Sequence, residues 1–595
     1  MAENILVSVA WPYANADIHV GNITGAYLPA DIFARYHRLA GNRVLMVSGS
    51  DSHGTPITVR ADAEKTTARE VFERFHRRFL ELYLKLGLSY DLFTHTDTEN
   101  HHRVSQAMFT ALLANGYLKL DREKMWYSAS ERRFLPDRYV EGECYICHYP
   151  NARGDQCDNC GNLLDANLLI NPRSKNDGST PELRETEHYY LDLPKLGPAL
   201  REYLAVDKEH WRPNVINFAR NQVAEGGLLP RPITRDLDWG IPVPLAGWEG
   251  KCLYVWFEAV IGYFSASIEW AANQGQPEAW KDWWYDTSAK TFYFIGKDNI
   301  PFHAVIWPAE LIGSGPIFAD GATGPYPNLP YDVPANEFMN MEGRKISGSR
   351  NWGVWGLDFL SRYDPDPLRY YLTANMPEAR DSDWSWDEFV ARNNNELVAT
   401  WGNLANRILT FAYKNFDGRV PDPGELRPED NALLSIVDEG HFKLLGQTLS
   451  EVKLRATLGL TMAIAAKVNQ YLDRQAPWFE VKSDRAAAAK TVYTTLKAVD
   501  SLKTLFAPFL PFTSERLHAL LGYDGSLFGS QKVVTYQETG RSHDALTYDP
   551  AGATGRWSPS RLPAGQRLRQ PEALFKKLEE KVAEEERARL GQATE

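Results

Sequence analysis

The chain has 595 residues, 44% of them hydrophobic and 24% charged, which is the ordinary composition of a folded protein of several domains. Acidic residues outnumber basic ones by 77 to 65, and the net charge of -12 excludes a global basic field that binds nucleic acid indiscriminately, although a local basic face remains possible. No apolar run approaches about 18 residues and no signal-peptide pattern is recognised, so we expect no membrane-spanning helix and a cytoplasmic location.

The first twenty-five residues predict a phosphate-binding turn between a strand and a helix. Residues 4–10 are apolar and β-branched, as is typical of a strand, and a small-residue loop then leads into an amphipathic segment. A helix N-terminus offers unpaired N–H groups and a partial positive charge. At this place His19 can donate a hydrogen bond to phosphate, and Gly21 lets the backbone approach a ligand. Alone, His-x-Gly-x is a weak motif, because a single histidine is more often structural.

Two further strands end in polar residues. Residues 44–51 are apolar and finish at Asp51, and the helical segment before them, which contains Pro29, stops near Gly41. Strand, helix and strand in this order favour a parallel, doubly wound sheet. Residues 291–298 predict another strand, which ends at Lys297-Asp298. Since ligands of open α/β sheets bind at the carboxyl ends of strands, we expect these polar groups to share one site.

Residues 117–238 interrupt this pattern with a loop-rich insertion that holds four cysteines. They form two C-x2-C pairs, and such pairs place two thiolates on one turn, so that two turns close a tetrahedral site. A disulfide is disfavoured in a cytoplasmic chain. We therefore predict one structural Zn²⁺, which folds a small knuckle and leaves no open position for catalysis. The expected ligands are Cys144, Cys147, Cys157 and Cys160.

The segment 341–349 is a second candidate for phosphate binding. Lys345 stands among small, flexible residues there, which suits a mobile loop that presents one cation. On its own, this pattern is more often a surface loop.

From about residue 386 the apolar spacing becomes helical, and it predicts an all-α domain of about 150 residues. Pro477 marks a break between two of its helices. Residues 523–570 give no interpretable pattern. The chain then ends in a charged segment that we expect to be helical, with four apolar residues on one face: Leu574, Phe575, Leu578 and Val582.

Together these motifs resemble a known family. His19-Val-Gly-Asn22 is similar to the HIGH motif of class I aminoacyl-tRNA synthetases, and Lys345-Ile-Ser-Gly-Ser349 is similar to their KMSKS loop, in the same order and with a domain inserted between. The neighbouring sequence narrows the resemblance to the methionyl-tRNA synthetases over about residues 4–515. The blocks that carry it are 10–15, 48–56, 254–259, 294–303, 403–407 and 475–478.

The resemblance implies roles for individual residues. Asp51 would bind the methionine ammonium group, within a methionine pocket made by Trp11, Tyr13, Asp51, Trp256, Tyr263 and His303. Aromatic rings suit such a pocket, since sulfur makes favourable contacts with their edges. ATP, with Mg²⁺, would be held by His19, Gly21, Asn22, Lys297, Asp298 and Lys345, and the catalytic motif residues would be His19, Asn22, Lys345 and Ser347. The tRNA anticodon would be read by Asn403, Arg407 and Trp478, with tryptophan for stacking and the other two for base edges.

The sequence departs from the family pattern at four positions. Asn22 replaces the second histidine of the HIGH motif, and Gly348 replaces the second lysine of the KMSKS loop, so Lys345 has to carry more of the charge stabilisation. Trp11 replaces a leucine in the pocket wall, and Asn299 stands where some relatives have isoleucine. Because asparagine can still donate to phosphate, we expect activity.

The implied fold is a Rossmann-type doubly wound α/β catalytic domain with an inserted zinc knuckle, followed by an all-α helix bundle that binds the anticodon. The predicted parts are the first half of the catalytic domain at 1–116, the insertion at 117–238, the second half at 239–325, the stem-contact region with the Lys345 loop at 326–385, the helix bundle at 386–540, and a tail with a helix at 541–595.

The implied function is a methionine–tRNA ligase that works with ATP, L-methionine and tRNA(Met), without a membrane and as a monomer. Catalysis would come from positioning and electrostatic stabilisation, since no protein nucleophile is needed. Two alternatives stay open at this point: a sister synthetase for another aliphatic or sulfur amino acid, and a tRNA-binding paralogue that has lost activity through Asn22 and Gly348.

Overall fold

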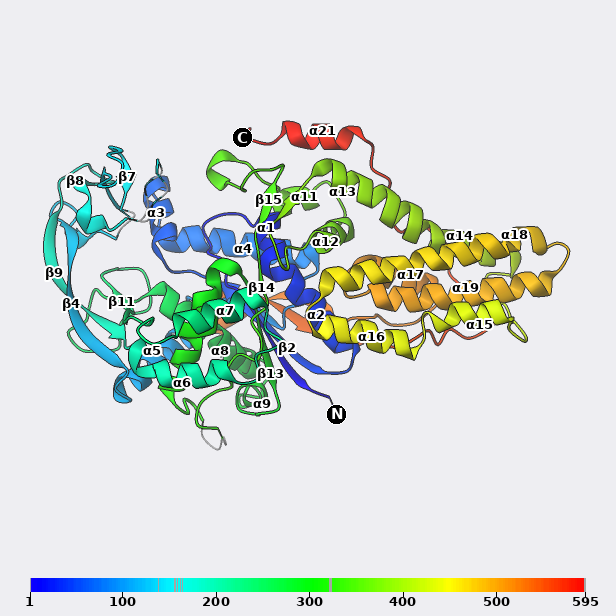
Figure 1. The fold of residues 1–595 in the computed structure, drawn as a ribbon, viewed down its shortest axis with the longest axis horizontal. Helices are drawn as coiled ribbons and strands as arrows, with labels where there is room; N and C mark the ends of the chain where they lie inside the picture. Colours follow the sequence, from blue (N-terminus) through cyan, green and yellow to red (C-terminus); the bar gives the residue numbers. More distant parts are fainter. Residues whose placement is uncertain are drawn as a thin grey trace.

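Seven strands form the central sheet, in the order β14–β13–β1–β2–β3–β18–β17 (Figure 1). The computed structural model describes residues 2–592 apart from 137–138, 155–156, 158, 161, 163 and 320–323, and the Ser349 side chain of the predicted loop motif also lies outside the described part. The strands are β1 (Asn4–Val9), β2 (Arg43–Ser50), β3 (Leu92–His95), β13 (Lys290–Gly296), β14 (Ala335–Asn336), β17 (Ser530–Glu538) and β18 (Arg541–Asp549).

The strands predicted at 4–10, 44–51 and 291–298 are present as β1, β2 and β13, and they are parallel, with Ile5 opposite both Val44 and Lys290. Alternate residues of β1 enter different hydrophobic clusters: Ile5 and Val7 join one, and Leu6 joins the other. Because successive side chains of a strand point to opposite faces, both faces of this sheet are covered, as a doubly wound fold requires.

Helices from both sides of the insertion cover the sheet. They are α1 (Val20–Asn22), α2 (Leu28–Leu39), α3 (Thr55–Glu64), α4 (Ala68–Leu86), α5 (Glu99–Ala114), α8 (Val255–Asn273), α9 (Lys281–Trp284) and α10 (Trp307–Ser314), with short turns η4 (Lys297–Asn299) and η5 (Phe302–Ile306). The segment around Pro29 stays helical, because a π-helical stretch, η1 (Ile23–Tyr27), joins α1 to α2 and Pro29 falls in the first turn of α2, where its missing N–H costs nothing.

The insertion contains more β-structure than its loop-rich sequence predicts. A long ribbon of β4 (Leu118–Ser128) and β9 (Glu182–Leu191), the central pair of a four-stranded sheet, carries a small three-stranded sheet of β6 (Val140–Glu143), β7 (Ala152–Arg153) and β8 (Ile170–Ser174). The ribbon is largely exposed and rich in charge, so it lacks the apolar alternation that marks a half-buried strand. The remaining elements are β5 (Arg133–Phe134), η3 (Ala166–Leu168), α6 (Leu193–Ala205), α7 (Pro213–Gln222), β10 (Arg231–Pro232), β11 (Thr234–Arg235) and β12 (Cys252–Leu253).

A connecting region and a helix bundle follow the sheet. The connecting region comprises β15 (Met339–Met341), η6 (Gly348–Arg350), α11 (Gly356–Leu360), α12 (Pro365–Ala374) and β16 (Ser382–Trp384). The bundle comprises α13 (Trp386–Arg392), η7 (Asn393–Gly402), α14 (Asn403–Asn415), α15 (Pro428–Ser435), α16 (Glu439–Ser450), α17 (Leu454–Gln475), α18 (Pro477–Glu480), α19 (Arg485–Phe506) and α20 (Pro511–Leu520). Pro477 does mark a break, between α17 and α18.

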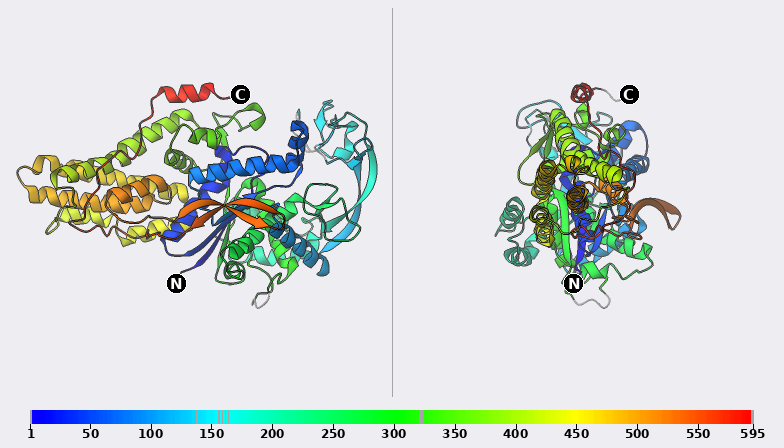
Figure 2. Two further views of the ribbon diagram at one scale, coloured as in Figure 1. Left: turned by 180° about the vertical axis from the view of Figure 1, so that it is seen from behind. Right: turned by 90° about the vertical axis from the view of Figure 1, so that its right-hand side faces the viewer.

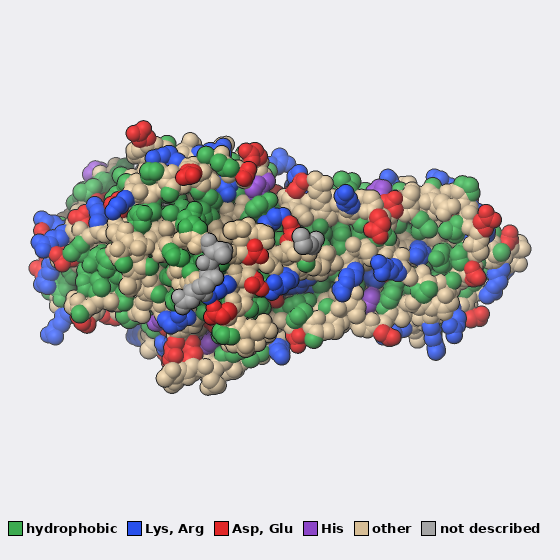
Figure 3. All heavy atoms as spheres, turned by 90° about the horizontal axis from the view of Figure 1, so that it is seen from below, with side chains coloured by type: hydrophobic (Ala, Val, Ile, Leu, Met, Phe, Trp, Pro, Cys, Tyr) green, Lys and Arg blue, Asp and Glu red, His purple; other side chains and the backbone are tan. Residues whose placement is uncertain are grey.

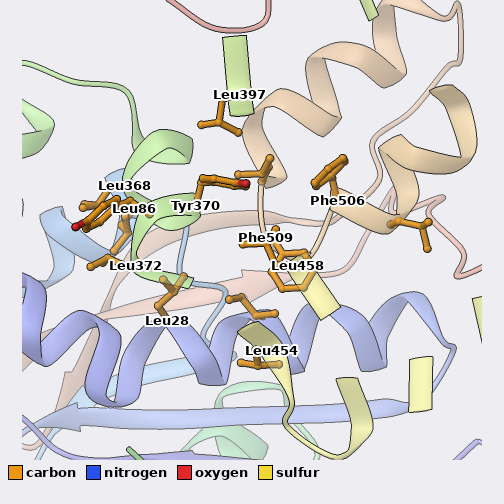
Figure 4. Packing of buried hydrophobic residues seen from close by; sticks show 14 of the residues in the cluster. Leu28, Leu86, Leu368, Tyr370, Leu372, Leu397, Leu454, Leu458, Phe506 and Phe509 are labelled. Carbon is orange, nitrogen blue, oxygen red and sulfur yellow. The ribbon is translucent and has the colours of Figure 1, made fainter. Parts of the chain in front are cut away.

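The bundle and the domain of the central sheet share one hydrophobic core. Figure 4 shows Leu28 of α2 and Leu86 of α4 near Leu368 and Leu372 of α12, with bundle residues such as Leu454 on the other side. A continuous buried cluster of this kind fixes the bundle relative to the sheet. The bundle and the inserted ribbon consequently lie at opposite ends of the long axis (Figure 1). The face in Figure 3 carries side chains of both charge signs, interspersed along its length.

A hairpin from beyond the bundle completes the central sheet, and this departs from the prediction that residues 386–540 are all helical. Strands β17 and β18 pair with each other, and β18 pairs antiparallel with β3, Leu546 opposite Phe93 (Figure 2, in orange). The predicted boundary at 540 falls in the turn of this hairpin, where Gly540 has a φ of 84°. A glycine turn between two runs of β-forming residues is a hairpin signal that could have been recognised.

The C-terminal helix is shorter than predicted. It is α21 (Lys581–Ala588), whereas Leu574, Phe575 and Leu578 lie before it in irregular backbone. That backbone is held by side chains of η7: Asn394 accepts from the Leu578 N–H at 2.9 Å, and Asn393 donates to the Lys576 carbonyl at 3.0 Å. The last residues of the predicted tail, 593–595, lie outside the described part. No helix of the described residues is long and apolar enough to cross a membrane.

Candidate functional site

A cavity of about 590 Å³ opens at the carboxyl ends of β1, β2 and β13. Eleven of the thirteen residues predicted for the methionine, ATP and catalytic sites line it: Trp11, Tyr13, His19, Gly21, Asn22, Asp51, Trp256, Tyr263, Asp298, His303 and Lys345. The structure therefore brings together groups from residue 11 to residue 345. The other two, Lys297 and Ser347, are not among the lining residues.

His19 and Asn22 hold each other at the start of α1. The Asn22 backbone N–H donates to the His19 ring at Nδ1 over 3.3 Å, and the Asn22 side-chain oxygen accepts from the His19 backbone N–H at 3.2 Å. Burial lowers the pKa of His19 to about 4, so the ring is neutral at pH 7. Because Nδ1 accepts, the proton is on Nε2, and Asn22 likewise keeps its NH₂ group for a ligand. Both side chains are thus arranged as donors.

A glycine is needed at position 21 because two side chains lie close to the backbone there. A Cβ built at this position would lie 3.0 Å from the His19 ring and 3.0 Å from the Ile346 side chain. The backbone therefore stays close to the segment that carries Lys345, in addition to any ligand it faces.

Lys345 is exposed and reaches the cavity from a loop that follows β15. The loop is tightly folded: Arg344 and Met341 exchange backbone hydrogen bonds, and so do Ser347 and Trp352. Ser347 therefore supports the loop through its backbone, while the neighbouring Gly348 lines the cavity.

Lys297 is held in an ion-pair cluster at the rim. Its ammonium group lies 2.6 Å from Glu337 and 2.8 Å from Asp381, and both carboxylates line the cavity. Asp298, the next residue, faces the cavity and has a raised pKa because burial disfavours its charged form. In this arrangement the positive charge of Lys297 neutralises acidic groups at the entrance.

Aromatic rings form the deep end of the cavity. Two glycines clear the space for the Trp11 indole: a Cβ at Gly49 would lie 2.1 Å from it, and one at Gly262 would lie 2.5 Å from it. These glycines explain how an indole fits at this position. The Trp256 ring stacks on Phe302 at 4.2 Å and meets Tyr13 edge-on at 6.1 Å.

The polar atoms at the aromatic end of the cavity are hydrogen-bonded within the protein. The Tyr263 O–H donates to His303 Nε2 at 2.7 Å, and His303 Nδ1 donates to the Asn299 carbonyl at 3.0 Å. Burial lowers the pKa of His303 to about 4 and keeps the ring neutral. With these atoms paired, the pocket presents mainly apolar ring surface, which suits an apolar or thioether side chain.

Asp51 adds one acidic group to this pocket. It is 3% exposed, and its Oδ1 accepts from the His53 backbone N–H at 3.2 Å. Burial and the nearby Glu258 carboxylate both raise the pKa of Asp51 well above its ordinary value. A buried carboxyl of this kind binds a cation, because the cation restores the charged form.

A buried network behind Asp51 was not predicted from the sequence. Glu258 accepts from His53 Nδ1 at 2.7 Å and from His101 Nε2 at 2.6 Å. Although burial alone would lower it, the Glu258 carboxylate raises the pKa of His53 to about 10, so that His53 is charged. Glu258 stands within the predicted 254–259 block, but a single glutamate in an apolar helix does not reveal its partners.

The four predicted cysteines come together in the inserted domain. Cys144 and Cys160 have their sulfurs 4.0 Å apart, and those of Cys147 and Cys157 are 3.6 Å apart, with all four within 4.8 Å. A tetrahedral Zn²⁺ with bonds of about 2.3 Å separates its sulfurs by about 3.8 Å, so the four residues fit this ion. The Ile146 backbone N–H points at Cys144 Sγ, as expected around a thiolate ligand.

A second surface site lies on the helix bundle. The Arg407 guanidinium is 5.0 Å from the centre of the Trp478 ring and pairs with Asp473 at 2.7 Å. Both residues line a cavity of about 350 Å³ between α14 and α18. Asn403 lies one turn before Arg407, exposed and outside that cavity. Phe479, which the sequence did not single out, is 80% exposed beside Trp478.

Known proteins match the whole chain. The family described as tRNA synthetases class I (M) matches residues 5–409, and the anticodon binding domain of methionyl tRNA ligase matches residues 420–543. Methionine–tRNA ligases from Thermomicrobium roseum and Roseiflexus castenholzii are 57% and 53% identical, each covering 99% of both chains. The solved Mycobacterium tuberculosis methionyl-tRNA synthetase in complex with methionyl-adenylate is 26% identical, with a TM-score of 0.73 over 96% of this chain and 99% of its own.

Proposed function

The chain belongs to the methionyl-tRNA synthetases of class I, and we propose which of its residues bind methionine, ATP and the tRNA anticodon. The protein is a methionine–tRNA ligase: it activates L-methionine with ATP and transfers the methionyl group to tRNA, releasing AMP and diphosphate. The two alternatives from the sequence, a sister synthetase and an inactive paralogue, are set aside by full-length relatives that carry this one activity in their names.

We assign methionine to the aromatic end of the cavity. The ammonium group pairs with Asp51, and the thioether lies among Trp11, Tyr13, Trp256, Tyr263 and His303. The support is that Asp51 is the buried acid at this end, while the polar atoms of Tyr263 and His303 are already paired. An ammonium and an apolar chain are therefore both accommodated.

We assign the ATP phosphates to the opposite end, between His19, Gly21 and Asn22 on one side and Lys345 on the other. His19 Nε2 and the Asn22 amide donate hydrogen bonds, and Lys345 supplies positive charge. Lys297 acts indirectly through Glu337 and Asp381, and Asp298 is the rim residue that faces the nucleotide. Mg²⁺ arrives with the triphosphate.

Two displacement steps follow from this arrangement. A methionine carboxylate oxygen attacks the α-phosphorus, a new P–O bond forms, and the bond to the β-phosphate oxygen breaks with release of diphosphate. A hydroxyl at the 3′ end of tRNA then attacks the activated carbonyl, and AMP leaves. The protein contributes no covalent nucleophile. It aligns the carboxylate, through Asp51 and the aromatic pocket, and it stabilises phosphate charge through His19, Asn22 and Lys345.

We assign anticodon reading to the cavity on the bundle. Trp478 offers a ring for base stacking, Arg407 and Asn403 offer groups for base edges, and exposed Phe479 offers a second ring. The Arg407–Asp473 pair keeps the guanidinium in one orientation at the mouth of the cavity. The partner is tRNA(Met).

We further propose one structural Zn²⁺ in the cysteine cluster, a monomeric protein and a cytoplasmic location. The sulfur distances support the metal. The domain division of the sequence stands as part of the proposal, except that the hairpin 530–549 belongs with the catalytic sheet. Light scattering during gel filtration tests the monomer.

These assignments rest mainly on one observation: eleven predicted residues line the same cavity. Methionine-dependent ATP–pyrophosphate exchange tests it. Lys345→Ala is expected to lower the exchange rate at least 100-fold, with methionine binding unchanged, because about 2.7 kcal/mol of charge stabilisation is lost. The matched control is Arg350→Ala, an exposed cation of the same loop that does not line the cavity. Unchanged exchange in Lys345→Ala overturns the assignment.

A further inference from the structure

The last described residues of the chain are hydrogen-bonded to the loop that carries Lys345. The Gly591 N–H donates to the Asn351 carbonyl at 3.0 Å, and the Asn351 side-chain amide donates to the Gln592 carbonyl at 2.5 Å. Figures 1 and 2 show the segment that follows α21 beside this loop, although the two segments are about 240 residues apart in the sequence. These bonds hold the end of the loop that follows Lys345.

A second contact holds the other end of the loop. Arg587 of α21 lies 3.1 Å from the Glu342 carboxylate, three residues before Lys345, and it also pairs with Asp387 of α13. Glu342 in turn accepts from the Trp386 backbone N–H at 2.9 Å. The C-terminal segment therefore touches the loop on both sides of its lysine, at residues 342 and 351.

Helix α21 is itself anchored, so it can act as a fixed support. Glu586 is 5% exposed and accepts from Arg362 at 2.7 and 2.9 Å and from the Tyr363 hydroxyl at 2.8 Å. Ala583 is buried in the main hydrophobic cluster. A partly buried bidentate pair of this geometry is stronger than an exposed ion pair.

The contact continues inward from Asn351 to the phosphate end of the cavity. The Asn351 side-chain oxygen accepts from the Trp355 indole N–H at 2.8 Å, and the Trp355 ring meets the His19 ring edge-on at 5.7 Å. Backbone bonds join the same two segments, from Val20 to Val354 and from Gly356 to Ile18. The last described residues are thus linked to His19 through the side chains of Asn351 and Trp355.

The loop needs such support for a physical reason. Residues 343–345 are exposed, and Gly343 and Gly348 give the backbone extra freedom. Ordering a residue costs about 1–2 kcal/mol of conformational entropy, and this cost has to be met when Lys345 meets a phosphate. Contacts that fix residues 342 and 351 in advance reduce the part that ATP binding has to supply.

We propose that the C-terminal segment 586–592 is a positioning element that preorganises the Lys345 loop for ATP, with Arg587 and the 591–592 backbone as its contacts. This rests on the proposed role of Lys345. The segment touches no substrate itself. It increases the fraction of molecules in which the loop already has a conformation that lets Lys345 reach the phosphates.

Three variants of the full chain test the proposal: Arg587→Ala, a truncation after Ala588, and the control Glu585→Ala. Glu585 lies on α21, is exposed, and pairs only loosely with Lys581 at 3.9 Å. We expect a 3- to 30-fold higher KM for ATP in pyrophosphate exchange for the first two variants, with the dissociation constant of methionine within twofold. We also expect faster trypsin cleavage after Arg344, Lys345 and Arg350. Glu585→Ala behaves like the parent chain.

Other outcomes overturn the proposal. Unchanged KM for ATP together with unchanged cleavage means that the contact has no positioning role. Equal losses in methionine and ATP binding mean general destabilisation, and faster exchange after truncation means that the tail restrains the enzyme. If Lys345→Ala leaves exchange intact, the role of Lys345 fails, whereas the cleavage rates still report whether the tail orders the loop.

Discussion

His53 Nδ1 lies 2.7 Å from the Glu258 carboxylate, next to Asp51 in the proposed methionine pocket. Both groups of this pair are charged although they are buried: Glu258 is fully buried and His53 is 2% exposed. Although burial alone would raise it, the His53 and His101 rings lower the pKa of Glu258 to about 2. Asp51 is therefore the carboxyl of this cluster that takes up the proton, and this governs how the pocket responds to a cationic substrate.

Methionine binding is expected to weaken as the pH falls. The pKa of Asp51 is raised by burial and by Glu258, so the free enzyme holds a proton there at pH values where an ordinary aspartate is ionised. The methionine ammonium favours the ionised form, so binding releases a proton. Below the raised pKa, the dissociation constant should increase about tenfold per pH unit. Calorimetry in two buffers of different ionisation enthalpy measures the proton release, and its absence over pH 5–8 contradicts the prediction.

Glu258→Gln should move this pH dependence to lower pH. The substitution removes the negative charge that raises the pKa of Asp51, while Asp97, the other carboxylate that raises the pKa of His53, keeps the positive charge of His53 in place. We expect the midpoint of the methionine binding profile to fall by about one unit or more. Glu269→Gln is the matched control: it is also a buried glutamate on α8, but its partners are Thr94 and His543. An equal shift in both variants would show that the effect is not specific to the network.

The sequence predicted the parts of the site that have regular local patterns. Strand ends and the loop motifs were recognisable, and the structure joins His19, Asp51 and Lys345 at one cavity. It did not predict the partners that only folding brings together, such as Glu258 with His101, 157 residues apart. The hairpin 530–549 has a local signal in its glycine turn, but its place on the central sheet could not be predicted for the same reason, because its neighbour β3 lies more than 400 residues earlier.

The fit of Trp11 should depend on Gly262. Gly262→Ala places a Cβ about 2.5 Å from the indole, so the ring has to shift toward the cavity that it lines, and we expect a loss of about 1–3 kcal/mol in methionine binding or stability. Trp11→Leu removes the clash, and the double variant should recover most of the KM for methionine that the single variant loses. If the losses of the two single variants add up in the double variant, Trp11 and residue 262 do not interact.

Removal of zinc should unfold the knuckle and leave the sheet in place. The cysteine cluster belongs to a small hydrophobic cluster of its own, with Leu135, Tyr139 and Val140. Such a cluster is too small to fold alone without its metal. We expect one zinc per chain by elemental analysis, protease cleavage within residues 139–174 after chelation, and retained methionine binding. Cys252→Ser is the control, since this buried cysteine lies outside the cluster. Zinc content that survives Cys144→Ser with Cys147→Ser excludes the site.

Glu310 of α10 should destabilise the protein at neutral pH. Its side chain is fully buried, and neither carboxylate oxygen has a hydrogen-bond partner among the described residues. Burial raises its pKa well above the ordinary value, so folding at neutral pH requires uptake of a proton, and this cost grows as the pH rises above about 4.5. Glu310→Met should therefore raise the unfolding free energy by about 1–3 kcal/mol at pH 8 and by clearly less at pH 5. Calorimetric melting at both pH values measures the difference. Glu310→Gln, which cannot ionise but stays polar, should gain less stability. If the stability gain of the Glu310→Met variant is the same at both pH values, the result contradicts a buried, neutral carboxyl at position 310.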